Sequence, residues 1–236
     1  MNKRLEGRIA LVTGASRGIG AAVARAFAAE GAHVVAVART TGALEELDDD
    51  VKRLGGSATL VPCDLLQHER IDQLGAALYE RFGRLDVLVG AAGMLGALSP
   101  VGHIKPKDWE QVFALNAGAN YRLIRSMDPL LRQSEAGRAI FVTDGVGRQP
   151  TAYWGPYAAS KAALENLALT YAGELHQTRV RVNLIDPGPV ATKLREKAFP
   201  GEDPAALRKP ADVAAAFVEL AVADCRRHGE RIVLAA

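Results

Sequence analysis

The chain has 236 residues, of which 49% are hydrophobic and 24% are charged, which is the composition of an ordinary globular protein. The formal net charge of +2 provides no strong field that would attract nucleic acid or a membrane surface, so neither is an expected partner. No apolar run approaches the length of a membrane span, and the charged N-terminus leads into a short strand, not a signal peptide. The two cysteines and the scattered histidines lack metal-ligand spacing, so we expect no metal and, by default, a cytoplasmic protein.

Short apolar runs alternate with helical patterns along the whole chain, and glycine or proline stands at most boundaries. In chain order the pattern predicts strand 8–12, helix 19–30, strand 33–38, helix 42–54, strand 58–61, helix 67–82, strand 85–89, helix 106–131, strand 138–143, helix 156–177, strand 179–185, helix 210–223 and strand 231–234. Within the longest helix, the pair Asp128 and Pro129 is expected to mark a bend.

Continuously apolar strands separated by helices predict an α/β fold, with a doubly wound, Rossmann-type parallel sheet and helices on both of its faces. The alternation is regular and contains no linker, which predicts a single domain over residues 1–236. In such a sheet, ligands bind at the carboxyl ends of the strands. The segment 188–204 is rich in proline and glycine, and we expect an irregular lid there.

The first strand is followed by a glycine-rich turn in which Gly14, Gly18 and Gly20 precede a helix. Glycines at a strand-to-helix turn let the backbone approach a phosphate, and the helix directs free N–H groups at its charge. An ordinary glycine turn is the alternative, but the strand–turn–helix context favours a dinucleotide-binding loop.

Two arginines indicate whether the site prefers the phosphorylated or the unphosphorylated nicotinamide dinucleotide. A site for the unphosphorylated cofactor needs an acid at the end of the second strand, and here that strand ends in Ala38, Arg39 and Thr40. Arg39, and Arg17 in the glycine turn, are placed to bind a 2′-phosphate, because arginine binds phosphate in a bidentate manner. Either arginine alone could be a solvated surface residue; together they favour NADP(H) over NAD(H).

Tyr157 and Lys161 are four residues apart and therefore fall on one face of a helix. There the ammonium is expected to lower the pKa of the phenol and make it a proton donor and acceptor for chemistry at a carbonyl or alcohol carbon. A plain surface pair is the alternative when the pair is considered alone.

The glycine spacing, the later Tyr157 and Lys161 pair and the expected fold together resemble the short-chain dehydrogenase/reductase family. The resemblance runs from Arg8 to about Leu234. It implies reversible hydride transfer between a nicotinamide cofactor and a small carbonyl or alcohol substrate, in a homo-dimer or homo-tetramer. The cofactor contacts that it implies are Gly14, Ser16, Arg17, Gly18, Ile19, Gly20, Arg39, Asp64, Leu65, Ala92, Gly93, Tyr157, Lys161, Pro187, Gly188, Val190 and Thr192.

The resemblance also implies a catalytic group of an asparagine, a serine, the tyrosine and the lysine. Asn116 matches the asparagine, whose implied role is to hold a water connected to the lysine. The serine position, thirteen residues before the tyrosine, is occupied by Asp144, an acceptor-only group when ionised that would repel a developing oxyanion. Three alternatives follow: Asp144 orients the substrate, the neighbouring Thr143 replaces the serine, or catalysis is weak or absent.

The alternative to an enzyme is therefore a non-catalytic or weakly active NADP-binding protein on the same fold. Substrate identity and direction are not encoded in any motif of the sequence. Trp154, before the tyrosine, is either a packing residue or a substrate platform. Lys193, Arg195 and Lys197 give the expected lid a basic character, which either favours an acidic substrate or serves solvation alone.

Overall fold

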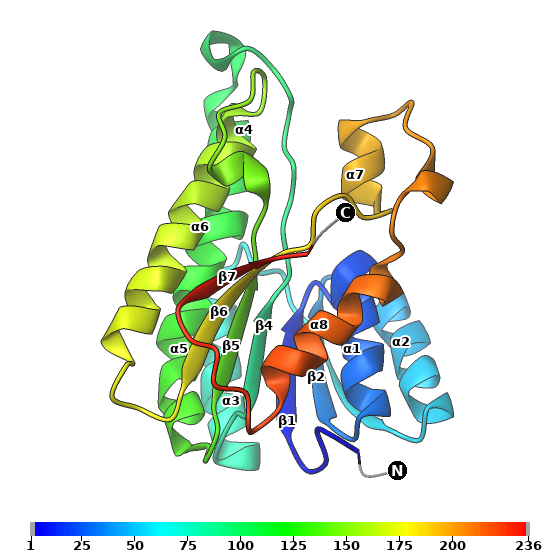
Figure 1. The fold of residues 1–236 in the computed structure, drawn as a ribbon, viewed down its shortest axis with the longest axis vertical. Coiled ribbons are helices and arrows are strands. Elements are labelled where there is room, and N and C mark those ends of the chain that lie inside the picture. Colours follow the sequence, from blue (N-terminus) through cyan, green and yellow to red (C-terminus); the bar gives the residue numbers. More distant parts are fainter. Residues whose placement is uncertain (1–2, 235–236) are drawn as a thin grey trace.

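A single parallel sheet of seven strands forms the centre of the computed structural model, which describes residues 3–234 (Figure 1). The spatial order of the strands is β3-β2-β1-β4-β5-β6-β7, and every neighbouring pair is parallel. The strands are β1 (Ile9–Thr13), β2 (His33–Ala38), β3 (Ser57–Pro62), β4 (Val87–Gly90), β5 (Arg138–Val142), β6 (Arg181–Asp186) and β7 (Glu230–Val233). The order reverses between β1 and β4, which is the switch point where doubly wound sheets bind ligands.

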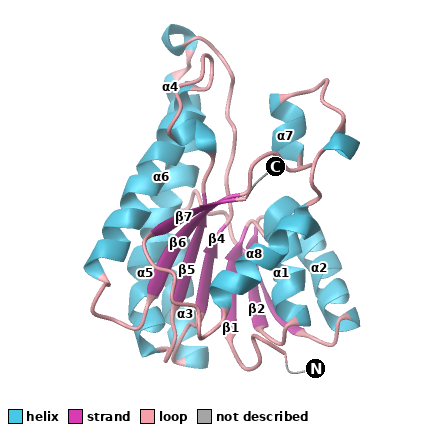
Figure 2. Ribbon diagram, in the orientation of Figure 1, coloured by secondary structure: helices cyan, strands magenta, loops and turns pink. Residues whose placement is uncertain are grey.

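Helices cover both faces of the sheet (Figure 2). They are α1 (Gly18–Ala29), α2 (Thr41–Arg53), α3 (His68–Phe82), α4 (Pro106–Phe113), α5 (Ala119–Gln133), α6 (Gly155–Glu174), α7 (Lys193–Ala198) and α8 (Pro210–Ala221). Helices α1, α2 and α8 lie on one side and α3, α5 and α6 on the other. The predicted Rossmann-type α/β fold is therefore confirmed.

The alternation of side chains along each strand creates two separate cores. In β1, Ile9 and Leu11 pack in the core beneath α3, α5 and α6, whereas Ala10 and Val12 pack in the core beneath α1, α2 and α8. Successive residues of a strand point to opposite faces, so a strand covered on both sides must be apolar throughout. All five residues of β1 are accordingly buried.

Two expectations need correction. The predicted helix 106–131 is divided at the π-helical turn Ala114–Gly118, and helix α5 continues through Pro129 to Gln133. The segment 188–204 is not irregular throughout, because it contains helix α7, whose first N–H groups are capped by the Thr192 hydroxyl at Arg195 N. Among residues 3–234, no helix is both long enough and apolar enough to cross a membrane.

Candidate active site

A cleft of about 1040 Å³ lies at the carboxyl ends of the strands. Asp144, at the predicted serine position, lines this cleft. So do all the residues expected to bind the cofactor, namely Gly14, Ser16, Arg17, Gly18, Ile19, Gly20, Arg39, Asp64, Leu65, Ala92, Gly93, Tyr157, Lys161, Pro187, Gly188, Val190 and Thr192. The fold thus brings together motifs that are distributed over most of the chain.

The glycine turn is shaped for close backbone approach. Gly14 has φ +67°, and a Cβ there would lie 3.0 Å from the Ala92 Cα atom; at Gly20 a Cβ would lie only 2.4 Å from the Gly14 carbonyl oxygen. Helix α1 begins at Gly18, with no side chain capping its first N–H groups and no acidic residue in its first turn. This leaves the positive end of the helix dipole free for an anionic group in the cleft.

Thr13, which sequence reasoning missed, organises the floor of this region. Its hydroxyl donates to the Val89 carbonyl at 3.1 Å and accepts from the N–H groups of Ala91 and Ala92 at 3.0 and 3.2 Å. Gly90 and Ala91 stand where the family resemblance implies two asparagines. A buried threonine at the end of β1 therefore fixes the backbone after β4 without an asparagine side chain, and the only signal for it in the sequence is its place just before Gly14.

Arg17 and Arg39 lie on the rim of the cleft and are both exposed. Neither has an ion-pair partner within residues 3–234, whereas many other arginines do. Strand β2 ends at Ala38, and no acid follows it before helix α2. Two unpaired guanidinium groups beside the end of β2 form a site suited to a phosphate.

Tyr157 and Lys161 lie side by side on α6, and both are buried. The Tyr157 phenol donates to Asp144 Oδ2 at 3.1 Å, and Lys161 Nζ donates to the Val142 carbonyl at 2.8 Å. The other Asp144 oxygen accepts from Val146 N at 3.1 Å, so its carboxylate acts as an acceptor on both sides.

The pKa values of this pair differ from the expectation. Burial, reinforced by the negative charges of Asp144 and Asp186, raises the pKa of Tyr157 well above its ordinary value. Burial also lowers the pKa of Lys161 to about 8, against the opposing pull of Asp144, Asp186 and Glu165. The expectation that the phenol has a lowered pKa beside Lys161 is therefore wrong for this arrangement. The charged group closest to the phenol oxygen is the Asp144 carboxylate, at 3.1 Å.

Asn116 lies behind the cleft, in the π-helical turn, and is fully buried. Its amide nitrogen donates to the Met94 carbonyl and to Ser160 Oγ, each at 2.9 Å, and its oxygen accepts from Met94 N at 2.9 Å. Asn116 thus joins the loop after β4 to helix α6. A π-helical turn often marks a functional position, since it changes the direction in which one side chain points.

The Thr143 hydroxyl is directed away from Tyr157. It donates to Glu165 Oε1 at 2.6 Å, and Glu165 also forms an ion pair with Arg231 on β7. Arg148, after β5, lies 3.6 Å from Glu165 and donates to Asp186 Oδ2 at 2.9 Å. Glu165 and Asp186 are buried, and the four charged residues come from four separate segments, which sequence reasoning did not identify.

Aromatic side chains connect Tyr157 to the segment 188–204. The Trp154 ring lies 5.8 Å from the Tyr157 ring and 5.7 Å from the Phe199 ring, measured between centroids. Trp154 also lines the cleft, so it both packs against Tyr157 and presents a surface to a ligand. Of the basic residues here, Arg195 is neutralised by Glu202 at 2.5 and 2.6 Å.

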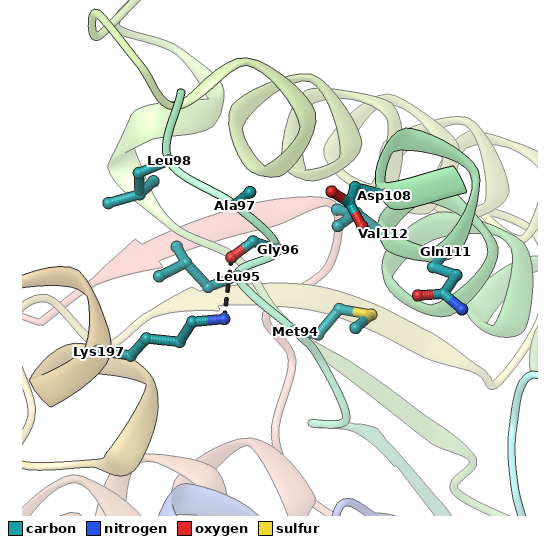
Figure 3. Close-up of a pocket in the computed structure, with 9 residues that line it drawn as sticks. All are labelled: Met94, Leu95, Gly96, Ala97, Leu98, Asp108, Gln111, Val112 and Lys197. Carbon is teal, nitrogen blue, oxygen red and sulfur yellow. Dashed lines mark hydrogen bonds between the residues drawn. The ribbon is translucent and has the colours of Figure 1, made fainter. Parts of the chain in front are cut away.

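A smaller pocket of about 390 Å³ adjoins the cleft and shares Met94, Leu95, Gly96 and Lys197 with it (Figure 3). Asp108, Gln111 and Val112 of α4 form its other side. Lys197 Nζ donates to the Gly96 carbonyl at 3.1 Å, which connects α7 to the loop after β4. Of the loop after β4, the sequence analysis identified Ala92 and Gly93, but not the residues from Met94 to Leu98 that line this pocket.

Comparison with known proteins agrees with this geometry. The sequence model described as "short chain dehydrogenase" matches residues 8–203. The chain is 38% identical to the oxidoreductase YciK of Escherichia coli (strain K12) over an alignment of 226 residues. The alignment covers 94% of this chain and 89% of that protein.

Solved structures share both the fold and the sequence. A chain from Pseudomonas syringae described as a short chain dehydrogenase is 37% identical, with a TM-score of 0.95. The superposition covers 99% of this chain and 96% of the Pseudomonas chain. Another, from Shigella flexneri 2a and complexed with NADP, is 36% identical with a TM-score of 0.92, covering 99% of both chains. These relatives give no support to the alternative of a non-catalytic protein. The chain is thus an oxidoreductase and belongs to the short-chain dehydrogenase family.

Proposed function

We propose that the protein transfers hydride between NADP(H) and a carbonyl or alcohol carbon of a small molecule. The observation that carries this proposal is the convergence of the glycine turn and the buried Tyr157 and Lys161 pair on one cleft. The Shigella flexneri relative complexed with NADP supports the choice of cofactor, as do the exposed Arg17 and Arg39 at the rim of the cleft.

The cleft fits such a cofactor on the evidence of its own shape. Backbone atoms occupy the space that side chains at Gly14 and Gly20 would need, and the N-terminus of α1 is uncapped. We assign the phosphates to this turn, the 2′-phosphate to Arg17 and Arg39, the adenine to Asp64 and Leu65, and the nicotinamide half to the segment from Pro187 to Thr192. When bound, the nicotinamide supplies or accepts the hydride.

Tyr157 is proposed as the proton donor to the carbonyl oxygen during reduction. The phenol is protonated at neutral pH, as a proton donor must be, and its raised pKa makes it a weaker acid than an exposed tyrosine. Lys161 is held at the Val142 carbonyl and is proposed to bind the nicotinamide ribose. Asn116 is a positioning residue, since it fixes the Met94 backbone and Ser160.

The experiment is an NADPH-binding titration by fluorescence, followed by a screen of ketones and aldehydes for NADPH oxidation. We expect NADPH to bind more tightly than NADH, and Tyr157→Phe to abolish turnover without changing NADPH affinity. Tyr79→Phe, at an exposed position on α3, is the matched control and should leave turnover unchanged. Cofactor binding with no turnover, unaffected by Tyr157→Phe, would support the non-catalytic alternative instead.

We further propose that residues 1–236 act as one domain, that 188–204 closes over the cleft, and that the protein forms a homo-dimer or homo-tetramer. Exposed apolar side chains on α4, α5 and α6 support the assembly: Trp109, Tyr121 and Leu169. Light scattering on the purified protein, with Trp109→Glu as the variant expected to dissociate it, tests this point.

A further inference from the structure

The charges around Tyr157 are unevenly paired. Three carboxylates act on the neighbouring Lys161, and two of them line the cleft, Asp144 and Asp186. Arginines match two of the three: Arg148 pairs with Asp186, and Arg148 and Arg231 pair with Glu165. Asp144 has no ion-pair partner within residues 3–234, and both of its hydrogen-bond donors, Val146 N and the Tyr157 phenol, are neutral. The half-buried Asp144 lines the cleft, so a carboxylate without a direct ion pair is presented to whatever binds there.

A buried or half-buried carboxylate without a counter-ion is costly unless a ligand supplies the cation. A neutral ketone cannot do so, and its oxygen becomes negative as hydride adds to the carbon, which Asp144 opposes. A protonated carbon–nitrogen double bond begins as a cation and loses its charge during reduction. From free substrate to transition state, the carboxylate therefore attracts an iminium ion and repels a developing oxyanion.

We propose that this site, if the proposed NADP(H)-dependent hydride transfer is correct, also reduces protonated C=N bonds, and that Asp144 selects iminium ions over ketones. The hydride adds to the iminium carbon, the π pair becomes the lone pair of nitrogen, and a neutral amine forms. Reduced nicotinamide is the reductant and is oxidised. No proton has to be transferred in this step, because the iminium nitrogen already carries its proton or alkyl group.

The aromatic wall of the cleft favours the same substrate class. Trp154 lines the cleft and lies against Tyr157, and a delocalised organic cation is attracted by the face of an indole ring. Two nearby arginines are paired with other carboxylates, Arg148 with Asp186 and Arg195 with Glu202. Lys161 acts on Asp144 through space but donates its hydrogen bond to the Val142 carbonyl. The outward side of the Asp144 carboxylate therefore faces the cleft without a direct ion pair.

The physical argument also says which kinetic constant changes. A carboxylate stabilises the bound iminium ion at least as well as the transition state, in which part of the positive charge is gone. Asp144 should therefore act mainly through the KM for the iminium substrate, and should not raise kcat. For a ketone it should lower kcat/KM.

The test compares N-methyl-3,4-dihydroisoquinolinium, which is cationic at every pH, with 1-tetralone, a neutral ketone of matching ring size. Binding of the cation to the protein without cofactor is measured by calorimetry, and NADPH oxidation is then followed with each substrate. The variants are Asp144→Asn, which removes the charge and keeps the shape, and Asp144→Ser. Asp49→Asn, on the exposed surface of α2, removes the same charge outside the cleft and is the control.

We expect wild type and Asp49→Asn to bind the cation equally, and Asp144→Asn to weaken its binding and raise its KM by about tenfold or more, as expected for loss of a close opposite charge. Asp144→Ser should raise kcat/KM for 1-tetralone. Ketone reduction without iminium reduction would overturn this inference and leave the proposed function standing. NADPH binding with neither activity would count against both. If Asp144→Asn weakened NADP⁺ binding but not binding of the cation, Asp144 would be a counter-ion for the oxidised cofactor, and the inference would be wrong.

Discussion

The phenol of Tyr157 donates its hydrogen to Asp144 Oδ2 at 3.1 Å, across thirteen positions of sequence. This contact joins the proposed proton donor to the residue at the predicted serine position. It stabilises the protonated phenol, because an ionised Tyr157 would face a carboxylate.

Asp144→Asn should therefore lower the pKa of Tyr157. Burial, the larger cause of the raised value, remains in the variant, so the pKa should stay above that of an exposed tyrosine. An ultraviolet difference titration measures the pKa of Tyr157 in the wild type and in Asp144→Asn. The same titration of each protein with Tyr157→Phe added gives the signal of the other tyrosines, which is subtracted. An unchanged titration would mean that burial alone sets the value.

Lys161 should make stability depend on pH. Its pKa falls from 10.5 to about 8 on folding, so between these values the unfolded state binds the extra proton. The stability of the wild type should then rise with pH across this window, relative to Lys161→Met, by up to about 1.4 kcal/mol per pH unit. Chemical denaturation of both proteins from pH 7 to about pH 10 measures this, and parallel curves would contradict it.

Arg17 and Arg39 should set the choice of cofactor. Arg39→Ala should weaken NADPH binding by about tenfold to a hundredfold, the value of a charge-assisted contact, and leave NADH binding nearly unchanged. The control is Arg226→Ala, an exposed arginine in the loop before β7, at the opposite edge of the sheet. Equal losses for NADPH and NADH would show that Arg39 does not contact the 2′-phosphate.

Gly20→Ala should disrupt the cofactor turn, because the new Cβ would lie 2.4 Å from the Gly14 carbonyl oxygen. We expect loss of NADPH binding and a destabilisation of about 1–3 kcal/mol, typical of overpacking. Gly173→Ala on α6 is the matched control: nothing lies within 4 Å of its Cβ, and replacing a helical glycine should stabilise by up to about 1 kcal/mol. Thermal unfolding and an NADPH titration of both variants measure these changes in stability and in cofactor binding.

Thr143→Val should distinguish a structural threonine from a catalytic one. The Thr143 hydroxyl is directed to the buried Glu165, so its loss should destabilise the protein by about 1–3 kcal/mol, the cost of a buried acceptor that loses its donor. Turnover per folded molecule should be preserved. A loss of turnover with unchanged stability would assign the role of the serine to Thr143.

The sequence was most informative where function depends on short-range patterns. Three glycines at a strand-to-helix turn, and Tyr157 four residues before Lys161, are local arrangements that the backbone of one turn or one helix converts directly into geometry. The apolar strands likewise predicted a sheet covered on both faces. Helix α7 was missed because the prolines and glycines around it obscure a helix of only six residues.

Tertiary structure alone decided the electrostatics of the site. Arg231 and Glu165 are 66 positions apart, and Arg148 and Asp186 are 38 apart, so no local pattern indicates that these charges neutralise one another. The same holds for Asp144, whose identity is visible in the sequence but whose lack of an ion-pair partner among residues 3–234 is not. A pattern in the sequence specifies which groups can react; the pKa of each group depends on burial and on charges that only the folded chain brings within a few ångströms.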